Sequence, residues 1–374
     1  MKIGIITHKL VRGDGQGRVN YEIARKALTA GHQVIAIAME VAPELQEEPN
    51  FDWVKVPVAA LPTYLLREHS FAIAAAIWLL CNRDECDVLH ANGFVTWHAG
   101  DLNTAHFVHS GFLRSGHYPF RPWQGVYAAY QSFYTGFNAL LERFIFRRAG
   151  MVVAVSRKVA EELMALGVSE TRIRVIYNGV DLDEFRPGYS IRRVLGLPEG
   201  KTMALFAGDL RTPRKNLDSV LRALVKVPEV HLAVAGALEG SPFPTLAESL
   251  SLSDRVHFLG KRTDMPALMR AADFFIFPSR YEPLGLVLME AMASGLPVIT
   301  ARCTGGAEML TAASGIVLED PDNVECLAEA IQLLRDQPEL RYSMGRAARC
   351  EIEHFTWCHM AESYLEAYRE VACA

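Results

Sequence analysis

Short apolar segments alternate with longer amphipathic segments along most of the chain. Apolar runs bounded by turn residues are typical of buried parallel strands, and apolar residues repeated at helical intervals are typical of helices. In the first half, the predicted strands cover residues 2–7, 33–39, 53–56, 88–91, 102–108, 151–155 and 174–176. The predicted helices of this half cover residues 18–30, 64–80, 123–149 and 157–166. This alternation indicates a doubly wound parallel sheet.

The same alternation returns in the second half. The predicted strands there cover residues 203–207, 231–235, 256–259, 274–277, 298–300 and 316–318, and the closing helices cover 324–334, 339–353 and 357–371. Residues 178–188 have turn residues at both ends and no apolar period, so we place a linker at 181–188. We therefore expect an α/β fold with two Rossmann-like domains, residues 1–180 and 189–356.

Composition and charge narrow the class of protein. A chain of 374 residues exceeds what one hydrophobic core usually supports, which fits two domains. The net charge of −5 argues against a general nucleic-acid-binding protein, so no nucleic-acid partner is expected. Seven cysteines without a C-x-x-C pair suit a reducing cytoplasm. Residues 1–10 do not resemble a signal peptide, and the longest apolar run, 71–81, is shorter than the roughly 20 residues that span a bilayer.

The segment PSRYEPLGLVLMEAMASGLP, residues 278–297, contains the clearest chemistry. It follows a predicted strand, forms a loop and continues as a mostly apolar helix. Two carboxylates, Glu282 in the loop and Glu290 in the helix, lie eight positions apart. A bend at Gly285 that opens into a helix N-terminus presents free amides to an anion. A bound phosphate flanked by two carboxylates, which accept hydrogen bonds from ligand hydroxyl groups, would fit a nucleotide sugar. The alternative is an ordinary strand–loop–helix unit in which Glu282 is solvated and Glu290 is paired with a cation.

Two loops that follow predicted first strands add candidate ligand contacts. Arg211, Arg214 and Lys215 lie in the loop after the strand at 203–207, where an open α/β sheet binds ligands, although a solvated basic loop has the same composition. In the first half, the loop GDGQGR contains Gly15 and Gly17. Its G-x-G-x-G spacing differs from the dinucleotide-binding pattern, so either a tight turn or a ligand contact fits it.

Histidines and aromatic residues mark two further places in the first half. His106 and His109 lie at the end of the predicted strand 102–108, and no third convergent ligand accompanies them, so no metal site is predicted. Residues 107–148 combine twelve aromatic residues with five arginines and a single glutamate. This composition suits a membrane-facing surface or a lipid-like acceptor, and it equally suits a lid with a core helix.

The chain resembles glycosyltransferase family 4, the retaining nucleotide-sugar-dependent enzymes of the GT-B fold. The resemblance is carried by the E-x7-E motif from Glu282 to Glu290, and by the segments GDGQGR, VSRKVAEELMALGV, IYNGVDLDEFRP, TPRKN and TGGAEML. It covers essentially the whole chain. It implies two Rossmann-like domains facing a central cleft, the first (1–180) for the acceptor and the second (189–356) for the nucleotide-sugar donor. It also implies that helix 357–371 crosses back onto the first domain.

The resemblance also implies a role for each matching residue of the second half. Glu290 binds the nucleotide ribose, Glu282 binds the donor sugar, and the amides of Leu284, Gly285 and Leu286 hold the diphosphate together with Lys215 and an arginine. The family commonly has a Gly-Arg pair where this chain has Gly208-Asp209. The diphosphate arginine is therefore Arg211 or Arg214, or it is absent.

In the first half, the resemblance places Gly15 and Gly17 near the donor phosphate and the acceptor. It places His106 beside the transferred sugar, with His109 as the second candidate. No metal or other cofactor is required, because the leaving phosphate itself takes the acceptor proton in the mechanism usually proposed for the family.

These features together predict a retaining glycosyltransferase. It would move a hexosyl unit from a nucleotide diphosphate sugar to a sugar, lipid-linked or small-molecule acceptor, in the biosynthesis of cell-surface polysaccharide, glycolipid or a related glycoconjugate. We expect it in the cytoplasm, at the inner face of the membrane, with membrane contact through residues 107–148. Two alternatives stay open: a nucleotide-sugar epimerase of the same architecture, and a non-catalytic sugar-nucleotide-binding protein. The base, the sugar, the acceptor, the linkage and the oligomeric state have no local signature.

Overall fold

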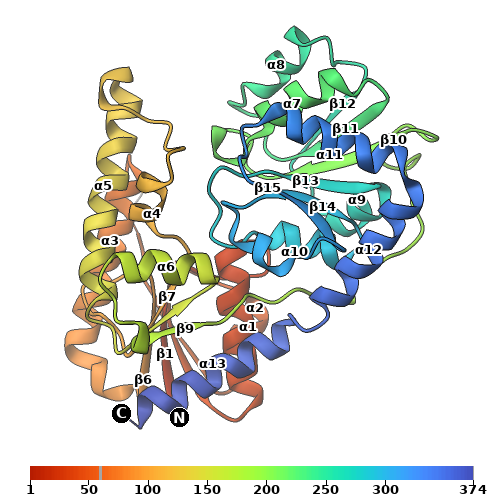
Figure 1. Cartoon of the computed structure of the whole chain (residues 1–374). Helices are drawn as coiled ribbons and strands as arrows, with labels where there is room; N and C mark the ends of the chain where they lie inside the picture. Colours follow the sequence, from red (N-terminus) through yellow and green to blue (C-terminus); the bar gives the residue numbers. More distant parts are fainter. Residues whose placement is uncertain (59–60, 374) are drawn as a thin grey trace. The chain divides into compact units, whose positions relative to one another are not determined.

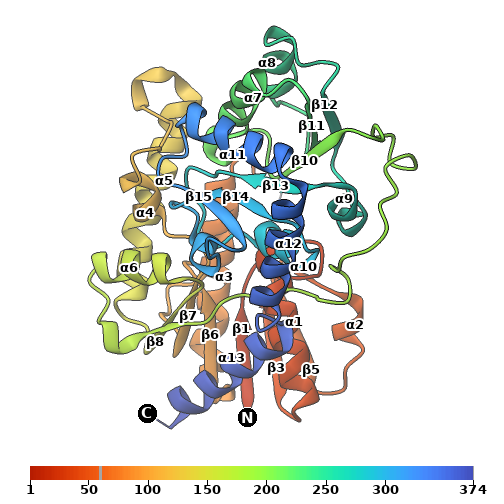
Figure 2. The same ribbon diagram turned by 45° about the vertical axis from the view of Figure 1, so that its right-hand side comes forward.

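The computed structural model describes residues 1–58 and 61–373, which divide into two compact units. The first unit comprises Met1–Gly116, Phe120–Gly179 and the chain from Trp357 onward, and the second comprises His117–Pro119 and Val180–Thr356. Figure 1 and Figure 2 show that each unit has its own sheet with helices on both faces.

The first unit is built on a seven-stranded parallel sheet with the order β5-β3-β1-β6-β7-β8-β9. Its strands are β1 (Lys2–Ile6), β3 (Gln33–Ala38), β5 (Phe51–Lys55), β6 (Val88–Asn92), β7 (Leu102–Ala105), β8 (Met151–Ala154) and β9 (Ile173–Val175). Its helices are α1 (Gly15–Thr29), α2 (Pro43–Gln46), α3 (Tyr64–Asn82), α4 (His109–Arg114), α5 (Val126–Phe146), α6 (Arg157–Ala165) and α13 (Trp357–Ala372). The short strands β2 (Lys9–Leu10) and β4 (Glu40–Val41) pair separately. The strand order reverses between β1 and β6, which is where such sheets bind ligands.

Alternating residues of β1 supply the two cores of this unit. Ile3 and Ile5 pack in a buried cluster with residues of α1 and with Tyr364 of α13. Ile6 points to the other face and packs in a second cluster with Phe71 of α3. Successive side chains of a strand point to opposite faces, so a nearly continuous apolar strand is buried on both sides.

A buried polar network attaches α13 to the sheet. His90 Nδ1 lies 2.7 Å from the Tyr368 hydroxyl, and His90 Nε2 lies 2.8 Å from the Thr104 hydroxyl. The hydroxyls of Thr104 and Tyr364 are 3.1 Å apart. Burial lowers the pKa of His90 to about 3, so the imidazole is neutral. The network fixes the position of α13 along β6 and β7, because a shift would leave buried polar groups without partners.

The second unit has a six-stranded parallel sheet with the order β12-β11-β10-β13-β14-β15. Its strands are β10 (Thr202–Ala207), β11 (Val230–Ala235), β12 (Val256–Gly260), β13 (Phe274–Phe277), β14 (Val298–Ala301) and β15 (Gly315–Leu318). Its helices are α7 (Leu217–Lys226), α8 (Phe243–Ser249), α9 (Met265–Ala271), α10 (Leu286–Ala293), α11 (Val324–Asp336) and α12 (Pro338–Ile352). Within this unit, α7, α8 and α11 lie on one face of the sheet, and α9, α10 and α12 lie on the other (Figure 1). The strand order reverses between β10 and β13.

Most predicted elements agree with the structure within a few residues, and two differences are informative. The predicted loop 13–18 forms the first turn of α1, because the Asp14 side chain accepts a hydrogen bond from the Gly17 amide at 2.8 Å and caps the helix. The predicted strand 102–108 ends at Ala105, and His109 already opens α4. The Glu142 carboxylate accepts a hydrogen bond from the His109 amide at 2.8 Å, which stabilises the start of that helix.

Candidate functional site

The candidate site of the second unit lies where β10 and β13 end, at the reversal of strand order. The loop after β10 contains a 3₁₀ turn, Pro213–Lys215, and the loop after β13 contains Glu282. Arg214 Nη1 lies 3.1 Å from Glu282 Oε2, and Lys215 Nζ donates a hydrogen bond to the same oxygen. The exposed fractions of the Arg214, Lys215 and Glu282 side chains are 22%, 12% and 14%. The structure thus joins two predicted loops into one cluster of charges that is largely shielded from water.

Burial and neighbouring charges act in opposite directions on Lys215 and on Glu282. Burial lowers the pKa of Lys215, and Glu282 opposes that shift. Burial alone would raise the pKa of Glu282, but the charges of Lys215 and Arg214 outweigh it and lower that pKa below its ordinary value. Lys215 Nζ also lies 4.9 Å from the centre of the Phe277 ring. The second carboxylate oxygen, Glu282 Oε1, accepts no hydrogen bond from residues 1–58 or 61–373.

Arg280 holds the basic loop in place. Its guanidinium donates to both carboxylate oxygens of Asp218, at 2.8 and 2.9 Å, and to Asp322 at 2.7 Å. It also donates to the carbonyl of Pro213 at 2.6 Å, and its backbone amide donates to the carbonyl of Arg214 at 2.8 Å. The sequence analysis missed this residue, because its partners lie far away in the sequence.

The turn before α10 presents backbone donors. Gly285 has a φ of +97°, a conformation that side chains disfavour, and it directly precedes the first residue of the helix. The amides of Leu284, Gly285 and Leu286 donate to no acceptor within the described part of the chain. The turn is held from outside by Gly306, whose amide donates to the carbonyl of Leu284 at 2.7 Å. These free amides at a helix N-terminus favour a bound anion.

The two remaining candidates of this unit are placed differently. Glu290 lies four residues after Leu286, so both are on the same side of α10. Arg211 pairs with Asp209, with Nε 2.9 Å from Oδ1, and its side chain is 61% exposed. Of the two candidate arginines, the structure therefore brings Arg214 to Glu282.

His106 lies in the first unit, directly after β7, and lines a small pocket of about 130 Å³. Its Nε2 is 3.1 Å from Oδ1 of Asn92, whose Nδ2 donates to the carbonyl of Ile6 at 3.2 Å. The Asn92 oxygen is therefore the acceptor, His106 Nε2 carries the proton, and Nδ1 is left as an acceptor. Burial lowers the pKa of His106 to about 4, so the ring is neutral at physiological pH.

His109 lines the same pocket and is held by Glu142, which sequence reasoning did not select. His109 Nδ1 is 2.7 Å from one Glu142 oxygen, and the buried carboxylate also accepts from the His109 amide. Burial opposes protonation of His109, but Glu142 outweighs it and raises the pKa. The signal that could have found Glu142 is its place as the single glutamate among the arginines of residues 102–148.

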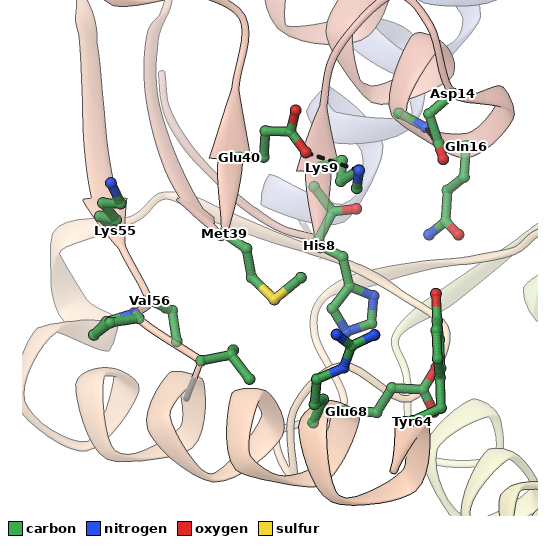
Figure 3. A pocket seen from close by; sticks show the side chains of 15 residues that line it. His8, Lys9, Asp14, Gln16, Met39, Glu40, Lys55, Val56, Tyr64 and Glu68 are labelled. Carbon is green, nitrogen blue, oxygen red and sulfur yellow. Dashed lines mark hydrogen bonds and ion pairs between the residues drawn. The ribbon is translucent and has the colours of Figure 1, made fainter. Parts of the chain in front are cut away.

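Gly15 and Gly17 form the first turn of α1, and Gly17 lines a larger cavity of about 760 Å³ in the first unit (Figure 3). This cavity and the small pocket of His106 share His8, Gln16 and Glu68 as lining residues. Among the described residues, no group of three or more His, Cys, Asp or Glu side chains is arranged to hold a metal ion.

Two doubly wound units, with a cation–carboxylate cluster beside a helix N-terminus, define a glycosyltransferase of the GT-B class. Residues 13–184 match the family model "Glycosyltransferase Family 4", and residues 189–350 match "Glycosyl transferases group 1". The chain belongs to this family, so the predicted resemblance is confirmed.

Curated relatives carry a more specific name. The chain is 31% identical over 308 residues to D-inositol 3-phosphate glycosyltransferase of Mycolicibacterium smegmatis, covering 75% of this chain and 67% of that protein. It is 36% identical over 242 residues to the Mycobacterium tuberculosis enzyme of the same name, covering 61% of this chain. The chain spans about half the length of the Mycobacterium tuberculosis relative, 50%.

Solved structures confirm the fold. Sucrose-phosphate synthase from Thermosynechococcus elongatus has a TM-score of 0.80 at 21% identity, covering 100% of this chain and 99% of that one. WaaG, a glycosyltransferase of lipopolysaccharide biosynthesis, has a TM-score of 0.79 at 21% identity, covering 98% and 99%. Anabaena HepE, solved in complex with UDP-glucose, has a TM-score of 0.73 at 18% identity, covering 99% and 100%. At these identities the likeness establishes the predicted GT-B fold.

Proposed function

We propose that this protein transfers a hexosyl unit, with retention of anomeric configuration, from a nucleotide diphosphate sugar to a hydroxyl group of a sugar, lipid-linked or small-molecule acceptor. The product would belong to cell-surface polysaccharide, glycolipid or related glycoconjugate biosynthesis. The observation that carries the proposal is the cluster of Lys215, Arg214 and Glu282 beside the free amides that precede α10. The UDP-glucose bound by HepE supports a uridine diphosphate sugar as the donor to test first.

The second unit would bind the donor through its charged groups. Departure of a nucleoside diphosphate places negative charge on its phosphates, and preorganised cations and amides stabilise that charge where it develops. The cations are Lys215 and Arg214, and the amides are the backbone amides of Leu284 to Leu286. Glu282 Oε2 holds the two cations, while Oε1 is left to accept a hydrogen bond from a hydroxyl of the donor sugar. Glu290, on the side of α10 that carries Leu286, would bind the ribose.

His106 would serve the transferred sugar as an orienting group rather than as a strong base. A neutral ring whose Nε2 proton is engaged by Asn92 offers Nδ1 to a sugar hydroxyl. The leaving phosphate would itself accept the proton of the acceptor hydroxyl. In this scheme Gly15 and Gly17 let the start of α1 approach the ligand without a side chain in the way.

A ligand panel tests the proposal directly. The melting temperature of the full-length protein is measured with UDP, GDP, ADP and dTDP and with their sugars, since a ligand that binds the native state raises it. The donor that shifts it is incubated with acceptors, and the anomeric configuration of the product is read by NMR. Absence of any shift and of any turnover would overturn the proposal. Conversion of the donor without an acceptor would instead identify an epimerase, and binding without turnover a non-catalytic protein.

Two variants test the donor site. Glu290→Ala and Lys215→Ala should each weaken donor binding by about tenfold or more, because each removes a hydrogen bond made by a charged group. Arg302→Ala is the matched control, since Arg302 forms an exposed pair with Glu319 in the same unit. Circular dichroism checks that each variant is folded. Wild-type donor affinity in both test variants would exclude this assignment.

We also propose that the first unit works at the inner face of the cytoplasmic membrane. Helices α3 and α5 meet at Glu68 and Tyr134: the Tyr134 hydroxyl lies 2.8 and 3.0 Å from the two carboxylate oxygens of Glu68. Segment Tyr64–Glu85 is long and apolar enough to cross a membrane by length and composition, yet Phe71 and Leu79 of α3 are buried against the sheet. Large apolar side chains exposed on or before these helices are Tyr64, Leu66, Ile73, Ile77, Leu80, Trp123, Val126, Tyr127, Phe133, Leu140 and Phe144.

The arginines of this region lie exposed and would meet anionic lipid headgroups. Co-sedimentation with phosphatidylglycerol vesicles, compared with phosphatidylcholine vesicles, tests the contact. We expect binding to the anionic vesicles that weakens in Trp123→Ser and in Leu140→Ser. Equal recovery of wild type and variants in the supernatant would contradict it.

A further inference from the structure

Three loops of the second unit come together at one edge of its sheet. They follow β10, β13 and β15, which belong to the same sheet in the order β10-β13-β14-β15. The loop after β10 carries Lys215, and the loop after β13 carries Glu282. Asn216 directly follows Lys215, and its side chain contacts both of the other loops.

The Asn216 side chain is fully buried and donates two hydrogen bonds. Its Nδ2 donates to the carbonyl of Pro278, the first residue after β13, at 3.0 Å, and to the carbonyl of Pro321, after β15, at 2.6 Å. Both neighbours are acceptors, so this position needs a group with two N–H donors, which a side-chain amide provides. The amide therefore ties the basic loop after β10 to two further loops at the same edge.

The backbone of Asn216 sets the direction in which the chain leaves Lys215. Its φ is +65° and its ψ is +35°, in the left-handed region, where the 3₁₀ turn Pro213–Lys215 ends and α7 begins. Its amide donates to the carbonyl of Pro213 at 3.1 Å. Among the non-glycine residues that the structure describes, Ser251 has a similar φ, +57°. Asparagine tolerates this conformation better than most residues with a side chain.

Two features of Asn216 are unfavourable by themselves. A left-handed backbone costs free energy in a residue with a side chain. The Asn216 Oδ1 atom is also buried without a hydrogen-bond partner among residues 1–58 and 61–373. A glycine at this position would avoid both costs. Residues that retain such costs concentrate at functional sites, where they hold a required geometry.

Lys215 is also held from its other side, through Arg214. The Arg214 carbonyl accepts hydrogen bonds from the Arg280 amide at 2.8 Å and from the Ser279 hydroxyl at 3.0 Å. Both neighbours of Lys215 in the sequence are thus bound to the stretch that directly follows β13. The same stretch leads to Glu282, the partner of Lys215, so one set of contacts places both members of this ion pair.

We propose that Asn216 is a positioning residue for donor binding, whose side-chain amide fixes the basic loop so that Lys215 Nζ faces the diphosphate of the donor. Asn216 is fully buried, so it acts through Lys215 rather than by contact with the donor. Small displacements of a charged group weaken its interaction with a ligand, which is why such groups need rigid support. The inference rests on the proposed function and adds the residue that sets the place of its cation.

Substitutions at Asn216 test the inference in the full-length protein. Asn216→Gly removes the amide and keeps the left-handed backbone without strain. Isothermal titration uses UDP-glucose first, or the nucleotide sugar that the ligand panel selects. We expect Asn216→Gly to raise the dissociation constant about tenfold, because the released loop no longer fixes Lys215. Asn216→Asp should raise it at least as much, because it turns a carboxylate toward two carbonyl oxygens.

Ser251→Gly is the matched control. It makes the same change of residue type at a left-handed backbone position of the same unit, but at an exposed side chain. Its dissociation constant for the donor should stay within about twofold of the wild-type value.

A double-mutant cycle with Lys215→Met distinguishes positioning from a role in stability alone. If Asn216 acts through Lys215, Asn216→Gly should weaken donor binding about tenfold in the wild-type background and less than about twofold in Lys215→Met. Its effect on urea denaturation should be the same in both backgrounds, because the bonds to Pro278 and Pro321 are lost in each. If circular dichroism shows that Asn216→Gly is not folded, Asn216→Ser, which keeps one hydroxyl donor, replaces it in the cycle with the same expected pattern.

Wild-type donor affinity in the folded Asn216 variant, or an equal loss of affinity in both backgrounds, overturns the inference while donor binding still stands. Absence of nucleotide-sugar binding to the wild-type protein would instead overturn the proposed function.

Discussion

Replacing Lys215 with methionine removes one of the two cations on Glu282 and keeps most of the side-chain volume. Removing one partner of a buried ion pair lowers the free energy of unfolding by about 3–5 kcal/mol when nothing else compensates the remaining charge. Here Arg214 stays 3.1 Å from the same oxygen and Glu282 remains 14% exposed, so water and Arg214 share the charge. We therefore expect Lys215→Met to lower the free energy of unfolding by about 1–2 kcal/mol.

Lys215→Met should weaken donor binding by more free energy than it costs in stability, and removing the Glu282 charge as well should not restore donor binding. A charge-assisted hydrogen bond to the diphosphate is worth about 1.5–3 kcal/mol, which corresponds to donor binding weakened by about tenfold to a hundredfold. Glu282→Gln alone leaves two cations facing each other, so the double variant Lys215→Met/Glu282→Gln should regain part of the lost stability while its donor affinity stays low.

Urea denaturation measures stability, and isothermal titration with the identified nucleotide sugar measures the dissociation constant. Wild type, the two single variants and the double variant form a double-mutant cycle. A coupling free energy near zero between Lys215 and Glu282 in this cycle would refute the ion pair. Wild-type donor affinity in Lys215→Met would refute the phosphate role. The pH dependence adds a check: because the pKa of Glu282 is lowered in the folded state, its contribution is present above the ordinary value of 4.5 and is lost as pH falls through the lowered value.

Three further predictions concern residues that hold the sites in place. Arg280→Ala should lower the free energy of unfolding by about 2–3 kcal/mol and weaken donor binding, because the loop of Pro213 loses its support; urea denaturation and titration measure both. Glu142→Gln should reduce kcat with donor affinity unchanged. It should also flatten the pH dependence of stability. The raised pKa of His109 contributes stability below pH 6.5, and this contribution is lost as pH rises through the pKa of His109 in the folded state. The contribution of His90 to stability has the opposite sign. Because the pKa of His90 is lowered from 6.5 to about 3, its contribution falls as pH drops below 6.5, by up to about 1.4 kcal/mol per pH unit, and His90→Gln should reduce the acid slope of stability by this contribution.

The Arg280 and His90 predictions each have a control within the chain. Arg302→Ala removes an exposed arginine of the second unit and should leave both stability and donor affinity unchanged. His354→Gln removes an exposed histidine and should retain the acid slope of the wild type. An Arg280→Ala protein with wild-type donor affinity, or a His90→Gln protein with an undiminished acid slope, would show that these residues do not act as described.

Much of the fold follows from local pattern. Two examples are the apolar run of β13, which a proline follows, and the glycine before α10. Both are visible in the sequence because each reflects the preferences of a few neighbouring residues. The E-x7-E spacing from Glu282 to Glu290 likewise marks the segment that we propose binds the donor. The capped start of α1 was missed by a few residues, because an aspartate cap moves a boundary that hydrophobic period alone does not locate.

Which charged residues come together in the candidate site was decided by the tertiary structure. Lys215 and Glu282 are 67 positions apart, and only the neighbouring placement of β10 and β13 brings their side chains together. Arg214 and Arg211 are indistinguishable in a basic loop until one meets Glu282 and the other meets Asp209. Local sequence determined which segments become strands, turns and helices, whereas the choice of partners among charged groups was decided by the order of strands, because that order sets which loops meet at one edge of the sheet.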